Sequence, residues 1–152
     1  MNILRRKLSS FYQLPAFIRW RLPLTWLLLG LGRLLVLTLP FRRLAPLLGG
    51  RHDAPWSPLI QPEQLAQLRA VRQLISITSQ YCPWQANCFA QAITARIWLG
   101  WYNLPYVLFF GVARDPSQQL KAHAWVMSGP IAVSGGNSFQ QFTVVGCYSH
   151  GD

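Results

Sequence analysis

Cys88 and His123 are the residues whose types and positions suit nucleophilic catalysis. Cys88 opens the stretch CFAQAITARIWLG, which has the composition of a helix. The free amides and the dipole at a helix N-terminus favour a thiolate, which is the attacking form of cysteine. His123 lies within LKAHAWVMS, a strand-like stretch, and a histidine held rigidly on a strand can act as a base. The pattern predicts a thiol nucleophile at a helix start and its base on a strand.

Each of these residues also has a plain structural interpretation. A free cysteine is often simply buried, and a lone strand histidine is more often a hydrogen-bonded structural group. The order of the two, the elements that carry them and their separation together favour catalysis. The remaining cysteines lack a helix terminus, because Cys82 precedes a proline and Cys147 lies in the last predicted strand. Both are expected to serve packing, and His150, near the C-terminus, is expected to be exposed.

The elements that position these residues follow from proline, glycine and apolar spacing. A helix is predicted from Trp26 to Thr38 with Thr25 as its N-cap. A second helical piece follows Pro40, and a proline-rich link begins after Gly50. No strand is expected before residue 58.

Two longer helices and an antiparallel sheet are expected in the rest of the chain. The helices are predicted from Pro62 to Gln80 and from Asn87 to Trp101, the latter apolar on more than one face and therefore central. Strand-like stretches then follow one another across turns: 106–114, 120–128, 129–136 and 141–148. Helices followed by a meander predict an α+β fold, with the cysteine on a helix and the histidine on the sheet.

The composition is apolar and basic. Hydrophobic residues make up 51% of the 152 positions, and fourteen Lys and Arg stand against four Asp and Glu. A disordered chain would have the opposite balance. The bases concentrate before residue 53, where no acid occurs. This end could meet an anionic membrane, an acidic peptide or nucleic acid, and a merely solvated basic face is the alternative.

Several classes of protein are excluded by what the sequence lacks. Three unpaired-looking cysteines do not form the even framework of a secreted disulfide protein, and no spacing suits zinc. No Walker loop or GxGxxG motif occurs, so no metal and no cofactor is expected. The run from Leu22 to Phe41 is nearly long enough to span a bilayer, but Arg33 would cost about 3 kcal/mol near its middle. We expect a buried or membrane-surface helix and a cytoplasmic protein, with membrane association left open.

Four stretches together carry a specific resemblance: CPWQANCFAQAITARIWL, LFFGVARD, LKAHAWV and SGGNSFQQFTVV. They resemble the transglutaminase-like leader peptidases of bacterial lasso-peptide biosynthesis, the B proteins. The upstream stretch TWLLLGLGRLLVLTLPFRRLAPLLG resembles the same family's apolar N-terminal region, so the similarity covers almost the whole chain. The resemblance implies a papain- or transglutaminase-like fold and a cysteine peptidase that removes the leader from a ribosomally made precursor.

Transferred to this sequence, the family's triad makes Cys88 the nucleophile and His123 the general base. The third member is usually an Asp about a dozen residues after the histidine, and here that position falls in SGGN, without an acid. Asn137 could orient the imidazole as the asparagine of papain-like enzymes does, or it could be only a turn residue. Asp115 is the weaker substitute, since its turn should point away from the cleft. The oxyanion that forms during attack could be held by the backbone amide of Cys88 together with the side chain of Gln85 or the indole of Trp84.

We expect residues 1–58 to form a basic helical segment and residues 59–152 the catalytic domain. Without a fused recognition module, the expected partners are the precursor's leader, a separate small leader-recognition protein and an asparagine-synthetase-like lasso cyclase. The basic segment could also contact a membrane surface, and no nucleic acid is expected. Two other functions stay open: a non-catalytic adaptor with a degenerate transglutaminase-like fold, and acyl transfer to an amine through the same Cys/His site.

Overall fold

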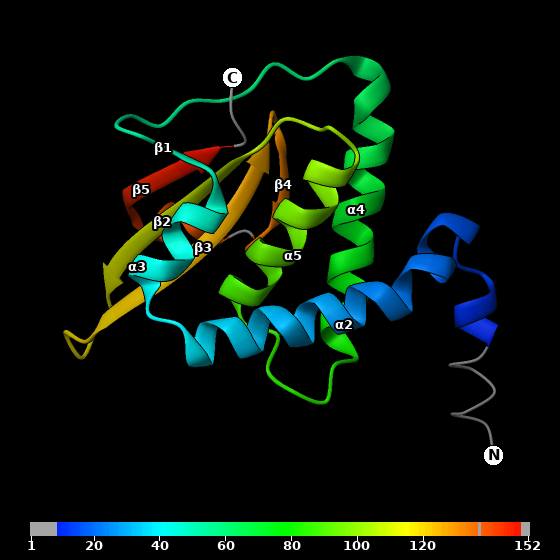
Figure 1. Cartoon of the computed structure of the whole chain (residues 1–152), viewed down its shortest axis with the longest axis horizontal. Coiled ribbons are helices and arrows are strands. Elements are labelled where there is room, and N and C mark those ends of the chain that lie inside the picture. The colour runs from blue at the N-terminus through cyan, green and yellow to red at the C-terminus, as the bar shows by residue number, and fades with distance from the viewer. Residues whose placement is uncertain (1–8, 137, 150–152) are drawn as a thin grey trace.

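The computed structural model describes residues 9–136 and 138–149, which form a layer of α-helices on one side of an antiparallel sheet (Figure 1). Residues 9–12 are helical, and the later elements follow along the chain. The helices are α2 (Ala16–Thr38), α3 (Phe41–Leu44), η1 (Ala45–Leu48), α4 (Pro62–Gln80), α5 (Cys88–Trp101) and η2 (Phe139–Gln141). The strands are β1 (Gly50–His52), β2 (Val107–Arg114), β3 (Leu120–Ser128), β4 (Ile131–Ser134) and β5 (Thr143–Ser149).

Helix α2 is longer than the sequence predicts. It begins after Pro15 and carries Pro23 inside it, so the prediction that Thr25 caps a helix starting at Trp26 is wrong. Thr25 is fully buried instead, and its hydroxyl donates to the carbonyl of Arg21 within the helix. A proline inside a helix removes one backbone hydrogen bond. Packing of α2 against α4 and α5 offsets that loss, a term that local spacing does not contain.

Helices α4 and α5 agree with the predictions. Helix α4 begins at Pro62, where the missing amide hydrogen costs nothing, and the Gln61 amide donates to the Gln64 side chain to close its first turn. Helix α5 begins at Cys88, and its N-cap Asn87 accepts a hydrogen bond from the amide of Ala90 at 3.0 Å. Figure 1 shows α5 in front of the sheet, with α4 beside it and α2 running across the end of both. The helix that starts at the cysteine is therefore central.

The sheet has the strand order β1-β5-β2-β3-β4, and all of its pairs are antiparallel. Strands β2, β3 and β4 form the predicted meander, and β5 returns to pair with the other edge of β2. Strand β1 is a correction, because no strand was expected before residue 58. Gly50 to His52 pair with the outer edge of β5, whose backbone groups would otherwise lack partners.

The two faces of the sheet bury different clusters. The larger cluster lies between the sheet and the helices and includes Ala124 and Val126 of β3, whose side chains point toward α5. The smaller cluster lies on the opposite face and contains Val107, Phe109, Trp125 and Cys147. Alternation along β3 assigns each residue of that strand to one of these two faces.

Candidate active site

Cys88 occupies the position predicted for a nucleophile, as the first residue of α5. Its side chain is partly exposed and packs against the larger cluster, on the helix side of the sheet. The capping bond from Asn87 satisfies one of the free amides of the first turn, and the remaining partial positive charge lies next to the sulfur. The amides that stay free in this turn can stabilise negative charge that develops when the sulfur attacks a carbonyl.

The imidazole of His123 is fixed by three contacts. Its Nε2 lies 2.7 Å from the carbonyl oxygen of Gly135, and the ring stacks on Phe142 and Trp125. A carbonyl only accepts, so Nε2 carries a hydrogen, and in the neutral ring the lone pair is on Nδ1. The ring is thus held in one tautomer, with one nitrogen able to act as a base.

The structure does not bring Cys88 and His123 together. The ring of His123 stacks on Trp125, which belongs to the smaller cluster, whereas its neighbours Ala122 and Ala124 point toward the helices. Cys88 packs on the helix side. The thiol and the ring therefore lie on opposite faces of β3, and no hydrogen bond joins them among the described residues.

A cavity of about 380 Å³ opens beside the first turn of α5, on the helix side of the sheet. Phe89 of α5, Phe110 and Gly111 of β2 and Ala122 of β3 line it, together with apolar side chains from the end of α2 and from α3. Gly111 is paired with His123 across the two strands. The cavity therefore lies next to Phe89, which follows Cys88, to Ala122, which precedes His123, and to Gly111, the cross-strand partner of His123.

The two side chains considered for the oxyanion differ in their surroundings. Trp84 lies against α2, with its ring centroid 4.4 Å from that of Trp26 and its edge over Gly30, where an added Cβ would come within 3.0 Å of the indole. Its buried Nε1 has no hydrogen-bond partner in the described part of the chain. Gln85 is exposed. Trp84 anchors α2 to the segment before Cys88, and its N–H group is buried beside α2.

The group that orients the His123 ring in the structure is a backbone carbonyl. Asn137 lies outside the described residues, as does His150. The carbonyl of Gly135 contacts the imidazole, whereas the sequence predicts this role for the side chain of Asn137. Gly135 has φ +94, and a Cβ added there would lie 2.2 Å from Cβ of Trp125, so only glycine fits. In the sequence, the consecutive glycines Gly135 and Gly136 could have indicated a tight turn whose backbone approaches His123.

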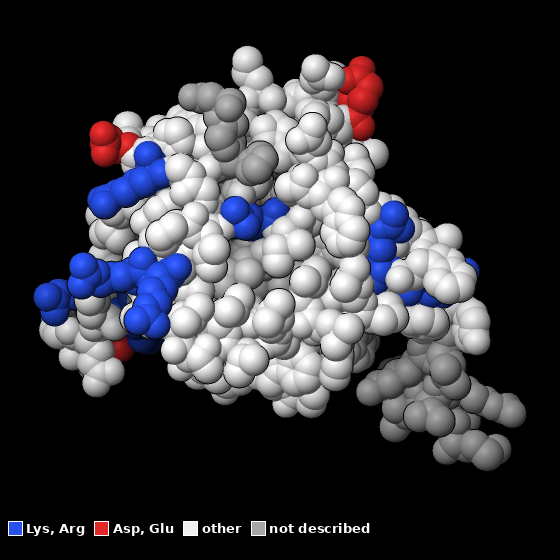
Figure 2. Space-filling model, viewed as in Figure 1, with Lys and Arg blue, Asp and Glu red and all other residues white. Residues whose placement is uncertain are grey.

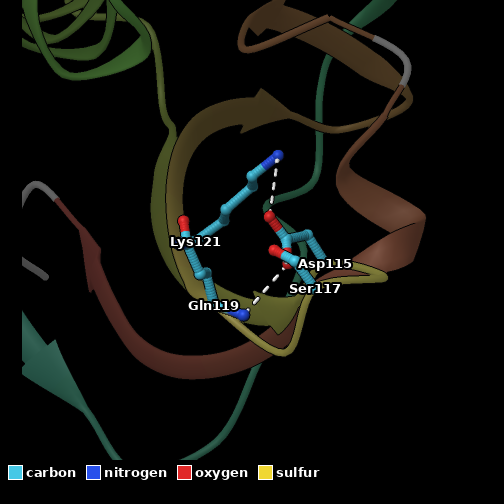
Figure 3. A network of polar contacts seen from close by, with 4 residues as sticks. All are labelled: Asp115, Ser117, Gln119 and Lys121. Atoms are coloured by element: carbon cyan, nitrogen blue, oxygen red, sulfur yellow. Dashed lines mark hydrogen bonds and ion pairs between the residues drawn. The ribbon is translucent and has the colours of Figure 1, made fainter.

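Asp115 is committed to its own turn, as Figure 3 shows. Its carboxylate accepts from the hydroxyl of Ser117 at 2.6 Å and from the amide of Gln119 at 3.0 Å, and Lys121 lies 3.5 Å away. The hydrogen bond from Ser117, followed by the one from Gln119, lowers the pKa of this carboxyl below its usual value. Asp115 thus stabilises the hairpin between β2 and β3, away from His123.

The other two cysteines have environments unlike that of Cys88. Cys147 is buried in β5, and its thiol donates to the carbonyls of His52 and Ala54 at 3.2 and 3.3 Å. Burial raises the pKa of Cys147, and it also raises the pKa of Cys82. Within residues 9–136 and 138–149, no three His, Cys, Asp or Glu side chains gather as a metal site would require.

Comparison with known families gives one match. The sequence matches the family described as Transglutaminase-like superfamily over residues 34–147, which runs from the second half of α2 into β5. The chain therefore belongs to the transglutaminase-like superfamily, a class that works as cysteine hydrolases or acyl transferases. The predicted α+β, transglutaminase-like fold is confirmed. Comparisons with curated proteins and with solved structures found no match.

Proposed function

We propose that this protein is a cysteine peptidase that removes the leader from a lasso-peptide precursor before cyclisation. The observation that carries the proposal is Cys88 as the first residue of α5 in a transglutaminase-like domain. The lasso substrate is supported by the stretches CPWQANCFAQAITARIWL and LKAHAWV, which resemble the leader peptidases of that pathway. The expected partners are the leader, a small leader-recognition protein and the cyclase, and the expected compartment is the cytoplasm.

Cys88 supplies the nucleophile. Its thiolate attacks the carbonyl carbon of the last leader residue, and the amides at the start of α5 stabilise the negative oxygen that forms. The C–N bond then breaks, the amine of the core peptide leaves with a proton, and the leader remains as a thioester on Cys88. Water attacks the thioester carbonyl and gives a proton to His123, the C–S bond breaks, and the leader leaves as a carboxylate while the Cys88 sulfur is regenerated. An amine in place of water would make the same intermediate a transferase reaction.

His123 moves the protons in this scheme. The acceptor carbonyl of Gly135 keeps hydrogen on Nε2, so Nδ1 takes the thiol proton and later gives it to the leaving amine. We propose that the Gly135 carbonyl sets the tautomer of the ring before substrate binds, which is part of the role of a triad acid, and that the contact is released when the ring moves toward Cys88. A thiol gives up its proton more readily than a serine hydroxyl, so proton transfer from Cys88 depends less on a carboxylate beside the histidine than it does in a serine triad.

Turnover requires the ring to reach the thiol, so β3 must rearrange when substrate binds. The cavity next to Phe89 and Ala122 offers room on the helix side for the ring or for an apolar substrate side chain. Catalytic contacts are often loose without substrate. Moving the His123 ring from one face of β3 to the other is a larger change than the tightening of a loose contact, and catalysis by this pair of residues requires it.

The same separation favours a second candidate, a non-catalytic adaptor with a transglutaminase-like fold. An adaptor needs neither a thiol on α5 nor a proton carrier on β3. It would bind its partner equally well without Cys88 or His123.

The test is reconstitution with a precursor peptide encoded beside this gene and its recognition protein, with mass spectrometry of the products. We expect the parent to release an intact leader with a free carboxylate. Cys88→Ala and His123→Ala should release none, while Cys82→Ala and Cys147→Ala should cleave. Full cleavage by Cys88→Ala would contradict the nucleophile. Binding of the precursor without cleavage by any variant, the parent included, would support the adaptor.

A further inference from the structure

Helix α2 has two opposite apolar faces, and only one of them is used inside the domain. Its inner face is buried against α4 and α5. Its outer face carries a row of exposed side chains at alternating spacings of four and three, the spacing of one helix face. This outer stripe consists of Trp20 (78% exposed), Leu24 (37%), Leu27 (60%), Leu31 (48%) and Leu34 (56%).

The outer stripe is too long and too apolar to be ordinary surface. From Trp20 to Leu34 it extends for about 20 Å along the helix axis. Soluble monomers rarely expose contiguous apolar patches of this kind unless a partner or a membrane covers them. The length and composition of α2 would let it cross a bilayer, and only 17% of its most apolar window is buried. Packing in the core of the domain therefore explains the inner face of α2 but not the outer stripe.

Positive charge lies at both ends of the outer stripe. Arg19 is on α2 beside Trp20, and Arg42 and Arg43 are exposed on α3, just beyond the end of α2. Figure 2 shows the uncharged lower edge of the molecule, where α2 runs, with Lys and Arg gathered at both ends of it. Residues 1–52 contain no acid, and among the described residues the one ion pair is the Lys121–Asp115 pair on the far hairpin. No carboxylate of the described residues therefore forms an ion pair with these arginines, and their guanidinium groups can bind an external anion.

The inner face of α2 keeps the helix attached to the domain. The indole N–H of Trp98 in α5 donates to the buried hydroxyl of Thr25 at 3.1 Å. Gly32 lies so close to α5 that a Cβ there would come within 3.2 Å of the backbone of Ala90. A spanning orientation would pull this face away from α5 and expose both. Helix α2 can meet a membrane only by lying along its surface.

We propose that α2 binds the surface of an anionic bilayer, with the outer stripe inserted among the lipids. Leucines with a tryptophan near one end, flanked by arginines and no acids, form the pattern of an interfacial helix. Arginine side chains reach outward to phosphate groups while their apolar stems stay near the hydrocarbon. A bilayer requires no matching shape, whereas a protein interface needs a complementary groove and favours aromatic and Met side chains at its centre. The lipid surface is therefore the occupant that the stripe fits best.

This arrangement would place the domain with α5 directly above α2 and the bilayer below it. The start of α5, which carries Cys88, lies close to α2 through the Gly32–Ala90 contact. The proposal rests on the exposure and charge of α2 and is independent of whether Cys88 is a catalyst.

The test is co-sedimentation of the full chain with vesicles of phosphatidylcholine alone or mixed with phosphatidylglycerol. We expect binding to the anionic vesicles that weakens with salt, and binding about tenfold weaker in the double variant Leu27→Glu/Leu31→Glu. Leu59→Glu is the matched control, because Leu59 is 96% exposed but lies outside α2, and this variant should bind almost like the parent. Circular dichroism of each variant checks that the helices are retained.

Four outcomes would overturn the proposal. The first is a parent that stays in the supernatant with anionic vesicles at low salt, and the second is a double variant that binds as tightly as the parent. Resistance to extraction by alkaline carbonate would mean that α2 spans the bilayer. A parent that does not bind vesicles and is a dimer, with the double variant a monomer, would assign the outer stripe to a second copy of this chain.

Discussion

The contact between His123 and the carbonyl of Gly135 makes a prediction that requires no substrate. Gly135→Ala should release the imidazole, because its Cβ would lie 2.2 Å from Cβ of Trp125 and 2.9 Å from the carbonyl of Ala124. The turn must move to relieve these contacts, and the carbonyl moves with it. Gly136→Ala is the matched control, since that residue also has a positive φ, +66, but has nothing within 4 Å of the added Cβ.

The expected magnitudes follow from these contacts. Alanine at a left-handed φ costs about 1–2 kcal/mol in either variant, so the control measures the backbone term alone. The additional loss in Gly135→Ala comes from the clash and from the missing hydrogen bond. A net hydrogen bond of about 1 kcal/mol changes the population of the Nε2–H tautomer by about fivefold. In a serine triad, loss of the correct tautomer costs about ten-thousand-fold in turnover, which sets an upper limit for this site.

The assay is nitrogen NMR of histidine-labelled protein, with His123→Gln used to assign the ring. We expect the parent and Gly136→Ala to show hydrogen on Nε2 of His123, and Gly135→Ala to show a mixture of tautomers. If Gly135→Ala is too unstable to study, the parent spectrum alone decides. Hydrogen on Nδ1 in the parent, or an unchanged spectrum in a folded Gly135→Ala, would refute the role of the carbonyl.

Two further predictions concern stability. Thr25→Val leaves the buried indole N–H of Trp98 without an acceptor, so it should cost about 1–3 kcal/mol, or about 2–4 °C in Tm for each kcal/mol. Thr38→Val removes only an exposed bond to the Leu34 carbonyl and should leave Tm nearly unchanged, and equal losses in the two variants would contradict the role of Trp98. Because the folded-state pKa of Asp115 is lowered, its stabilisation is present above the unfolded pKa and lost as pH falls through the folded pKa. Chemical denaturation should therefore find Asp115→Asn less stable than the parent at about pH 7 and equal to it at about pH 2; a difference that persists in acid would argue against this carboxylate.

Local patterns were sufficient for most of the fold. Proline at the start of α4 and Asn87 before α5 marked both helices, since caps and periodicity act within a few residues. Helix α2 and strand β1 were predicted less well, because their limits depend on partners distant in sequence: α4 and α5 for the helix, and β5 for the strand. Long-range packing of this kind leaves little trace in local spacing.

The candidate site shows the same division. The position of Cys88 at a helix start and of His123 on a strand could be predicted from composition and alternation. The face toward which His123 points could not, because alternation fixes which residues share a face but not which face meets the helices. The Gly135 carbonyl was also missed, since a search for side chains overlooks a backbone acceptor.

The most direct test of Cys88 as the nucleophile is the rate at which each thiol reacts with iodoacetamide at neutral pH, measured by peptide mass mapping. We predict that Cys88 is modified first and that the fraction of peptidase activity lost equals the fraction of Cys88 modified. Cys82 and Cys147 should react more slowly, because burial raises the pKa of both thiols and lowers their thiolate fraction. Modification of Cys82 or Cys147 before Cys88, with activity lost in step, would contradict the assignment.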